Sequence, residues 1–114
     1  MTTRSDSPDT PVQLADADEL AAFVATHDLV LVDFYTNGCA ICQSIEPVVG
    51  NVARATEAAV GTLNPRDDPE LIDTYDVRSV PTLLLFEDGE LVDRLAEGFQ
   101  ETQAVVEFVE NRGE

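Results

Sequence analysis

Residues 29–42 read LVLVDFYTNGCAIC, and this stretch decides the fold. Leu29–Tyr35 is an apolar, Val-rich run interrupted only by Asp33, which is typical of a central strand covered on both faces. A short Asn-Gly turn follows, and a helix is predicted from Cys39 to about Thr56. The order of buried strand, turn and helix puts Cys39 and Cys42 where the strand gives way to the helix.

The rest of the chain alternates between strand-like and helix-like patterns. Strands are predicted at Val12–Ala15, Ala58–Leu63, Thr82–Phe86 and Glu90–Leu95, the last two forming a hairpin around Asp88-Gly89. Helices are predicted from the Asp16 cap to about His27, from an Asp67 or Asp68 cap with Pro69 first through Tyr75, and at Glu101–Arg112. This order predicts an α/β fold in which helices sandwich a mixed central β-sheet.

Charge is the strongest signal in the composition. The chain of 114 residues carries 23 acidic and 6 basic residues, a net charge of -17, and every basic residue is Arg. Such a field disfavours nucleic acid as a partner. It also destabilises the compact state by self-repulsion, which molar salt removes by shrinking the Debye length to about 3 Å. We therefore expect a halophilic acidic protein, against the alternative of an ordinary acidic one.

The domain organisation follows from length and local composition. The first 11 residues are polar and acidic, and we expect them to form a disordered tail ahead of one domain at residues 12–114. No apolar run approaches the roughly 20 residues of a membrane helix, so we expect no membrane partner. The start has neither the basic cap nor the apolar stretch of a secretory signal, and we expect a cytoplasmic location.

Cys39 and Cys42 are the only cysteines. At the start of a helix, backbone N–H groups and the helix dipole favour a thiolate over a thiol. With this spacing the exposed Cys39 attacks a substrate disulfide, and Cys42 resolves the mixed disulfide. Two alternatives remain from the residues alone: a pair of inert helix cysteines, or a zinc site, for which His27 is the only histidine and the ligand set is incomplete.

Four motifs stand in a characteristic order along the chain. They are LVDFY at residues 31–35, CAIC at 39–42, VPT at 80–82, and the segment from Leu83 to Gly89. In order, spacing and context these motifs resemble the thioredoxin family, and the resemblance covers about residues 12–111. It implies a thioredoxin fold.

The resemblance also implies roles for individual residues. Cys39 is then the nucleophile, Cys42 the resolving thiol, and Asp33 a buried proton carrier. Pro81 is a cis-proline facing the disulfide, and the Val80 backbone pairs with an extended substrate. The residues by themselves leave Asp33 as a structural acid and Pro81 as an ordinary trans-proline at a strand start as alternatives.

Three positions depart from the family pattern. Gly38 replaces the usual Trp before the first cysteine, so the groove beside that cysteine should be more open. Ala40 and Ile41 replace the common Gly-Pro pair, and the Ile41 N–H becomes available to the thiolate, which would make the couple more oxidising. Thr62 replaces a Lys near the buried acid, so the pKa of Asp33 should run higher. The residues expected to bind substrate are Gly38, Ala40, Ile41, Val80 and Pro81.

The resemblance implies an enzyme: a thiol/disulfide oxidoreductase that reduces protein disulfides through a reversible Cys39–Cys42 disulfide. Its expected partners are a flavin-dependent thioredoxin reductase as electron donor and client proteins with disulfides. We expect a monomer without a bound cofactor or metal. The alternatives are a redox-inert binding module with the same fold, and a more oxidising protein that acts as a disulfide oxidase or isomerase.

Overall fold

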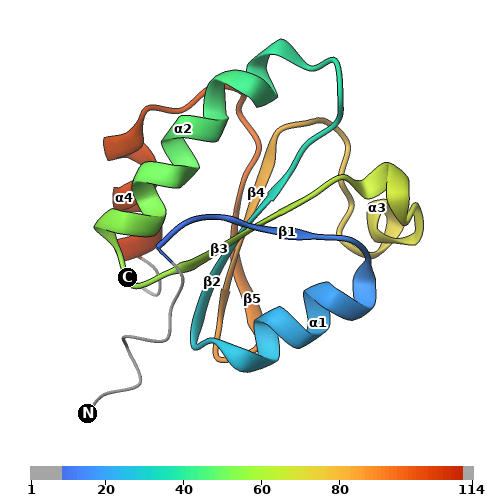
Figure 1. Ribbon diagram of the computed structural model, residues 1–114, viewed down its shortest axis with the longest axis horizontal. Helices are drawn as coiled ribbons and strands as arrows, with labels where there is room; N and C mark the ends of the chain where they lie inside the picture. Colours follow the sequence, from blue (N-terminus) through green and yellow to red (C-terminus); the bar gives the residue numbers. More distant parts are fainter. Residues whose placement is uncertain (1–8, 112–114) are drawn as a thin grey trace.

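The computed structural model describes residues 9–111 and contains a five-stranded mixed sheet (Figure 1). The strands lie side by side in the order β1-β3-β2-β4-β5. β1, β3 and β2 are parallel, and β4 and β5 are each antiparallel to their neighbour. Their bounds are β1 Val12–Leu14, β2 Leu29–Phe34, β3 Ala59–Leu63, β4 Thr82–Glu87 and β5 Glu90–Leu95. Residues 1–8 of the expected tail lie outside the described residues.

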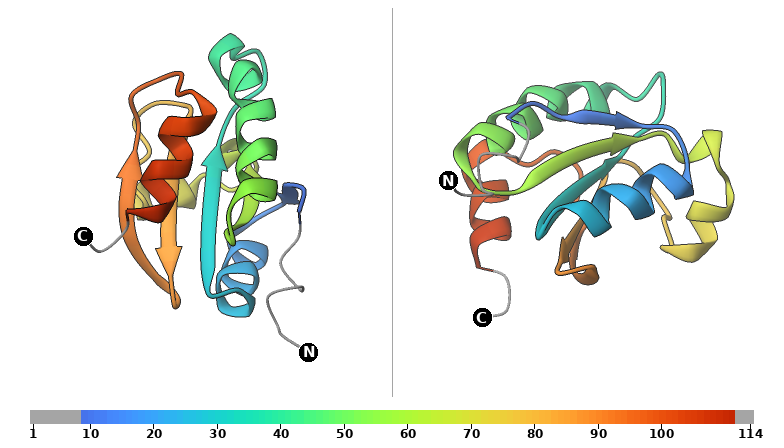
Figure 2. Two further views of the ribbon diagram at one scale, coloured as in Figure 1. Left: turned by 90° about the vertical axis from the view of Figure 1, so that its left-hand side faces the viewer. Right: turned by 60° about the horizontal axis from the view of Figure 1, so that its bottom comes forward.

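Helices cover both faces of this sheet (Figure 2). Helices α2 and α4 pack on one face, and α1 and α3 pack on the other. The helix bounds are α1 Ala17–Thr26, α2 Ala40–Ala55, α3 Glu70–Thr74 and α4 Thr102–Glu110. The predicted α/β sandwich is thus confirmed, and Arg112, the expected end of the last helix, lies beyond the described residues.

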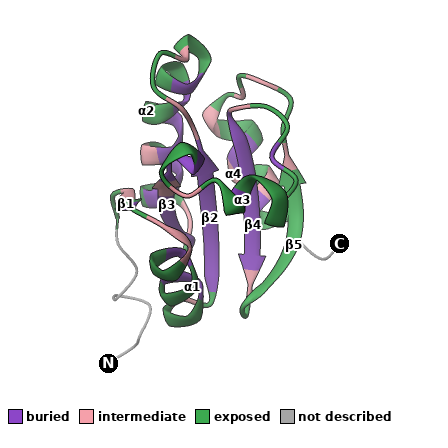
Figure 3. Cartoon of the chain, turned by 90° about the vertical axis from the view of Figure 1, so that its right-hand side faces the viewer, coloured by how far each residue is buried: buried purple, intermediate pink, exposed green. Residues whose placement is uncertain are grey.

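β2 is buried along its whole length, as the prediction of a strand covered on both faces requires (Figure 3). Successive side chains of a strand point to opposite faces. Val30, Val32 and Phe34 therefore join the core beneath α1 and α3. Leu29 and Leu31 join the core beneath α2 and α4, so Asp33, two positions on, also faces the α2 side.

The strand register brings three segments to one edge of the sheet. Phe34 at the end of β2 pairs with Thr82 at the start of β4, and Leu95 at the end of β5 pairs with Leu83. The loop that contains Pro81 therefore lies at the sheet edge from which the chain turns into α2 (Figure 1).

The prediction that Asp67 or Asp68 caps the third helix, with Pro69 in its first turn, is wrong. Pro69 itself occupies the cap position of α3, and residues 65–67 form a separate 3₁₀ turn capped by the side chain of Asn64. The Asp68 carboxylate instead accepts a hydrogen bond of 3.0 Å from the N–H of Ala17, the first residue of α1. The start of α1, which is distant in the sequence, therefore donates to Asp68 the hydrogen bond that the local sequence predicted for α3.

Between residues 9 and 111, no helix is long and apolar enough to cross a membrane.

Candidate active site

Cys39 and Cys42 are joined by a disulfide at the start of α2, with their Cα atoms 5.2 Å apart. Cys39 occupies the cap position of the helix and is partly exposed, whereas the side chain of Cys42 is buried. The Cys39 Sγ accepts a hydrogen bond of 3.1 Å from the N–H of Cys42. The helix start thus holds one sulfur that a partner can reach and one that it cannot.

The donor to this sulfur in the disulfide form is the Cys42 N–H, whereas the expectation for the Ile41 N–H concerns the reduced thiolate. Within the described part of the chain, the hydrogen bond to Cys39 Sγ comes from the Cys42 N–H, not from the Ile41 N–H. A cap side chain bonds the N–H groups of the second or third helical residue, and Cys42 is the third. Restoring an N–H at Ile41 therefore supplies no hydrogen bond to the sulfur in this structure.

The surface around Cys39 is open. Gly38 has a φ of 79°, in the left-handed region that favours glycine, and a Cβ built there would meet no atom within 4 Å. Ala40 is exposed, and the side chain of Ile41 is 46% exposed. The accessible Cys39 sulfur thus lies between the exposed side chain of Ile41 and a turn at Gly38, which has no side chain.

The Val80–Pro81 peptide bond is cis, as the resemblance implied. Pro81 is buried, and Val80, two residues before the start of β4, is partly exposed. Because Phe34 at the end of β2 pairs with Thr82 at the start of β4, this loop lies next to the end of β2.

Asp33 lies under this edge and is 1% exposed, and its Oδ1 has no hydrogen-bond partner. Burial, reinforced by the negative charge of Glu46, raises the pKa of Asp33 from 3.8 to about 7. The prediction of a buried acid is thus confirmed, and the upward direction of its pKa agrees with the expectation. Thr62, the residue in place of a lysine, stands directly opposite Asp33 on β3 and donates a 3.3 Å hydrogen bond to Gln13.

Cys42 and Asp33 belong to the same side of the sheet. The buried residues of α2 recur at the spacing of one helical face and are Cys42, Ile45, Val48, Val49, Val52 and Ala53. Asp33 is the last α2-facing residue of β2, and Cys42 is the first buried residue of α2. Both residues therefore lie on the same face of the sheet, near the end of β2 from which the chain enters α2 (Figure 1).

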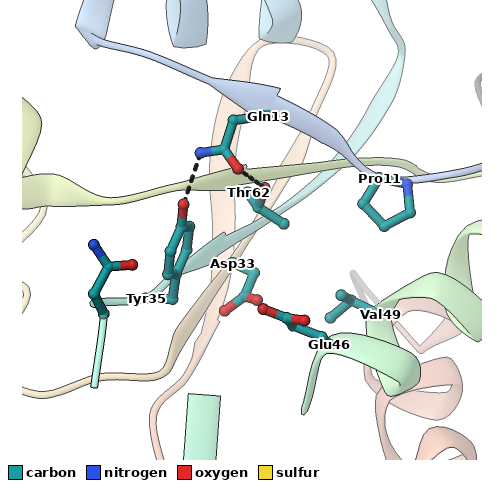
Figure 4. A pocket seen from close by; sticks show the side chains of 8 residues that line it. Pro11, Gln13, Asp33, Tyr35, Glu46, Val49 and Thr62 are labelled. Atoms are coloured by element: carbon teal, nitrogen blue, oxygen red, sulfur yellow. Dashed lines mark hydrogen bonds between the residues drawn. The ribbon is translucent and has the colours of Figure 1, made fainter. Parts of the chain in front are cut away.

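A pocket of about 480 Å³ opens beside Asp33 (Figure 4). Its lining comes from β1, β2, β3, α2 and the segments next to them: Pro11, Gln13, Asp33, Tyr35, Asn37, Glu46, Val49 and Thr62. Two of these lining residues are bonded to each other: the Gln13 Nε2 donates a 2.8 Å hydrogen bond to the Tyr35 hydroxyl. The pocket therefore gives the buried carboxyl a polar opening.

Sequence reasoning did not single out Glu46. Its signal is its spacing: Glu46 comes four residues after Cys42, one helical turn along α2. Among residues 9–111, no group of three or more His, Cys, Asp or Glu side chains is arranged to hold a metal ion.

A reachable sulfur bonded to a buried one, above a carboxyl able to hold a proton near neutral pH, defines a class of protein: one that exchanges thiols and disulfides. Comparison with known proteins agrees. The family model described as Thioredoxin matches residues 11–111. A thioredoxin from Chlamydia caviae is 33% identical over 99 residues, which cover 86% of this chain and 95% of that protein.

Solved structures extend the comparison. A single-residue variant of thioredoxin from Halobacterium salinarum matches with a TM-score of 0.88 and 39% identity, and the match covers 95% of each chain. Mitochondrial thioredoxin 3 from Saccharomyces cerevisiae, in its oxidised form, matches with a TM-score of 0.79 at 18% identity and supports the fold alone. The chain belongs to the thioredoxin family, and it is a thiol/disulfide oxidoreductase.

Proposed function

We propose that this protein reduces disulfides of client proteins, with Cys39 as the attacking sulfur and Cys42 as the resolving one. The observation that carries the proposal is the Cys39–Cys42 disulfide, in which Cys39 is partly exposed and Cys42 is 2% exposed. A redox-inert binding module would have no need of this pair. We propose a flavin-dependent thioredoxin reductase as the donor that returns the two electrons after each turnover.

The reaction begins on the reduced pair. The Cys39 thiolate attacks one sulfur of the client disulfide, forms a mixed disulfide and releases the first client thiolate. The Cys42 thiol then loses its proton and attacks Cys39 Sγ, which releases the second client thiolate and forms the Cys39–Cys42 disulfide. Two electrons pass from the protein to the client, and both client sulfurs leave reduced.

Two features of the site support these roles. The Cys42 N–H bond to Cys39 Sγ would stabilise negative charge on that sulfur once the disulfide is reduced. Asp33, on the α2 face of β2 with an unpartnered oxygen, supplies an acceptor for the Cys42 proton. Because burial raises the pKa of Asp33 to about 7, the carboxyl can both take up and give back a proton near neutral pH.

Client binding is assigned to the surface around the accessible sulfur. Gly38, Ala40 and Ile41 are exposed beside Cys39. An extended client segment would lie across them and pair with the backbone of the Val80–Pro81 loop at the same sheet edge. The resemblance assigned these residues to substrate, and their exposure and register support the assignment.

We also propose that the protein works in the reducing cytoplasm of a cell with high internal salt. The net charge of -17 supports the salt requirement, since close-range repulsion is screened only at high ionic strength. A rise in the unfolding midpoint between about 0.1 and 2 M KCl supports this proposal, and an unchanged or falling midpoint overturns it.

The test of the sulfur roles is a trapping experiment with matched variants. Cys42→Ser should accumulate a mixed disulfide through Cys39 with a disulfide-bonded client such as insulin, because no thiol is left to resolve it. Cys39→Ser should trap none, and both variants should lose turnover. Trapping by Cys39→Ser alone would reverse the assignment, and unchanged turnover in either variant would remove the disulfide from the mechanism.

A further inference from the structure

Asp33 must exchange a proton with solvent in every turnover, yet it is 1% exposed. If Asp33 takes the proton of Cys42, that proton has to leave before the next cycle. Its Oδ1 is buried and has no hydrogen-bond partner among the described residues. The pocket that Asp33 lines is the opening beside this carboxyl, and we take it as the route of the proton.

Glu46 stands at this opening. It lies on α2 one helical turn beyond Cys42, it is exposed to solvent, and it lines the pocket together with Asp33. Figure 4 shows the two carboxyl groups facing one another. One of the two carboxyl groups that line the pocket is thus buried, and the other is exposed to solvent.

The other groups around Asp33 leave Glu46 as the natural acceptor. β3 contributes Thr62 and β4 contributes Leu83, which pair with Asp33 across the sheet. β1 contributes Gln13, and Tyr35 follows β2 with its hydroxyl held by that amide. Within residues 9–111, the pocket lining contains no basic side chain that would fix Asp33 in its ionised form.

We propose that Glu46 relays the proton of Asp33 to solvent through this pocket. The inference rests on the proposed role of Asp33 as the acceptor of the Cys42 proton, and it makes Glu46 a relay residue that acts through Asp33. The coupling of the two carboxyls supports it, because the charge of Glu46 is one cause of the raised Asp33 pKa.

The relay conserves protons at each step. Cys42 transfers its proton to the Asp33 carboxylate, and the neutral Asp33 passes this proton on to the Glu46 carboxylate, directly or through one water molecule. Because the proton can then no longer return to Cys42, the Cys42 thiolate persists long enough to attack the mixed disulfide, and the relay contributes to the rate at which that disulfide decays. Glu46 releases the proton to bulk water, and both carboxyls are ready for the next cycle.

The experiment follows decay of the mixed disulfide in single-turnover reactions of the reduced protein with insulin, quenched with acid, from about pH 5 to 9. Wild type is compared with Glu46→Gln, Glu46→Asp and Asp33→Asn in molar KCl. Glu90→Gln serves as the matched control: it removes the same charge from an exposed residue at the start of β5, at the opposite end of the sheet. Circular dichroism checks that each variant is folded.

We expect Glu46→Gln to lower the plateau rate roughly tenfold, at the modest end of general acid–base effects. Sodium formate, at constant ionic strength, should restore most of this rate, because the small carboxylate enters the pocket and carries the proton instead. Glu46→Asp should keep a larger share of the rate than Glu46→Gln, and Glu90→Gln should match wild type with or without formate.

Two results would overturn the relay. One is a Glu46→Gln profile that shifts along the pH axis but reaches the wild-type plateau, since Glu46 would then act through its field alone. The other is a lowered plateau that formate does not raise, which would give Glu46 a structural role. The Asp33→Asn variant separates the two proposals: a wild-type decay rate there removes Asp33 as the acceptor, whatever Glu46 does.

Discussion

The two faces of strand β2 differ in the side chains that they present at the end of the strand. On the face covered by α1 and α3, Val30, Val32 and Phe34 are fully buried in an apolar cluster. On the face covered by α2 and α4, the strand ends with Asp33, whose Oδ1 is unpartnered beside a polar pocket. One face is closed by apolar packing, whereas the other ends in an unpartnered carboxyl oxygen beside a polar pocket.

This difference has a thermodynamic consequence. Buried apolar side chains contribute to folding at every pH, but a buried carboxyl without a partner opposes folding once it ionises. The buried apolar side chains should therefore determine how stable the protein is, those of the α1/α3 face among them, and the Asp33 end of β2 should determine how fast it works. Substitutions on the two faces test this division.

The largest effect on stability is expected from Leu84→Ala. Leu84 is fully buried in the apolar cluster beneath α1 and α3, where it pairs with Val32. Removing its side chain should cost about 2–5 kcal/mol of unfolding free energy through lost transfer energy and a residual cavity. Turnover per folded molecule should stay near wild type. Denaturant unfolding and insulin reduction in molar salt measure the two quantities, and a stable but slow variant would contradict the division.

A smaller effect of opposite sign is expected from Asp33→Asn. The folded-state pKa of Asp33 is raised to about 7, above an unfolded value near 3.9, so the folded state keeps its proton longer as the pH rises. Wild-type stability should therefore fall between about pH 4 and 7 and level off above pH 7. Asparagine removes this loss and should stabilise the protein by on the order of 2–4 kcal/mol at pH 8, with little difference near pH 4.

The same variant should resolve mixed disulfides more slowly, by about 10²-fold at most, because the amide cannot take the Cys42 proton. Unfolding midpoints and single-turnover rates at several pH values test both statements. A destabilised Asp33→Asn variant with an unchanged rate would make Asp33 a structural acid and would leave Cys42 to lose its proton to water.

The sequence was sufficient for the parts of the molecule that depend on local patterns. The apolar run at residues 29–35, the Asp-Gly hairpin turn and the CxxC at a helix start are each legible in one segment, and the structure contains all three. The burial of Asp33 followed in the same way, since a charged residue inside a strand covered on both faces has nowhere else to go.

What sequence reasoning missed depends on contacts between distant segments. The pocket draws its wall from residues between Pro11 and Thr62, and nothing in any one segment indicates that they meet. Local sequence predicts that Asp68 caps α3. Its carboxylate instead accepts a hydrogen bond from the N–H of Ala17, which lies 51 residues earlier in the chain. The donor to Cys39 Sγ is different: the cap geometry of α2 already favours the Cys42 N–H, and the rule for helix caps would have identified it.

The most direct test of a proton held beneath Cys42 is a carbon-13 NMR titration of the Asp33 carboxyl in the disulfide form, assigned with Asp33→Asn and recorded in molar KCl. The account predicts a single transition with a pKa of about 7, because burial and the neighbouring Glu46 charge both disfavour the carboxylate. A transition near the ordinary value of about 4 would contradict it, since Asp33 would then be a solvated or hydrogen-bonded acid with no proton to exchange at neutral pH.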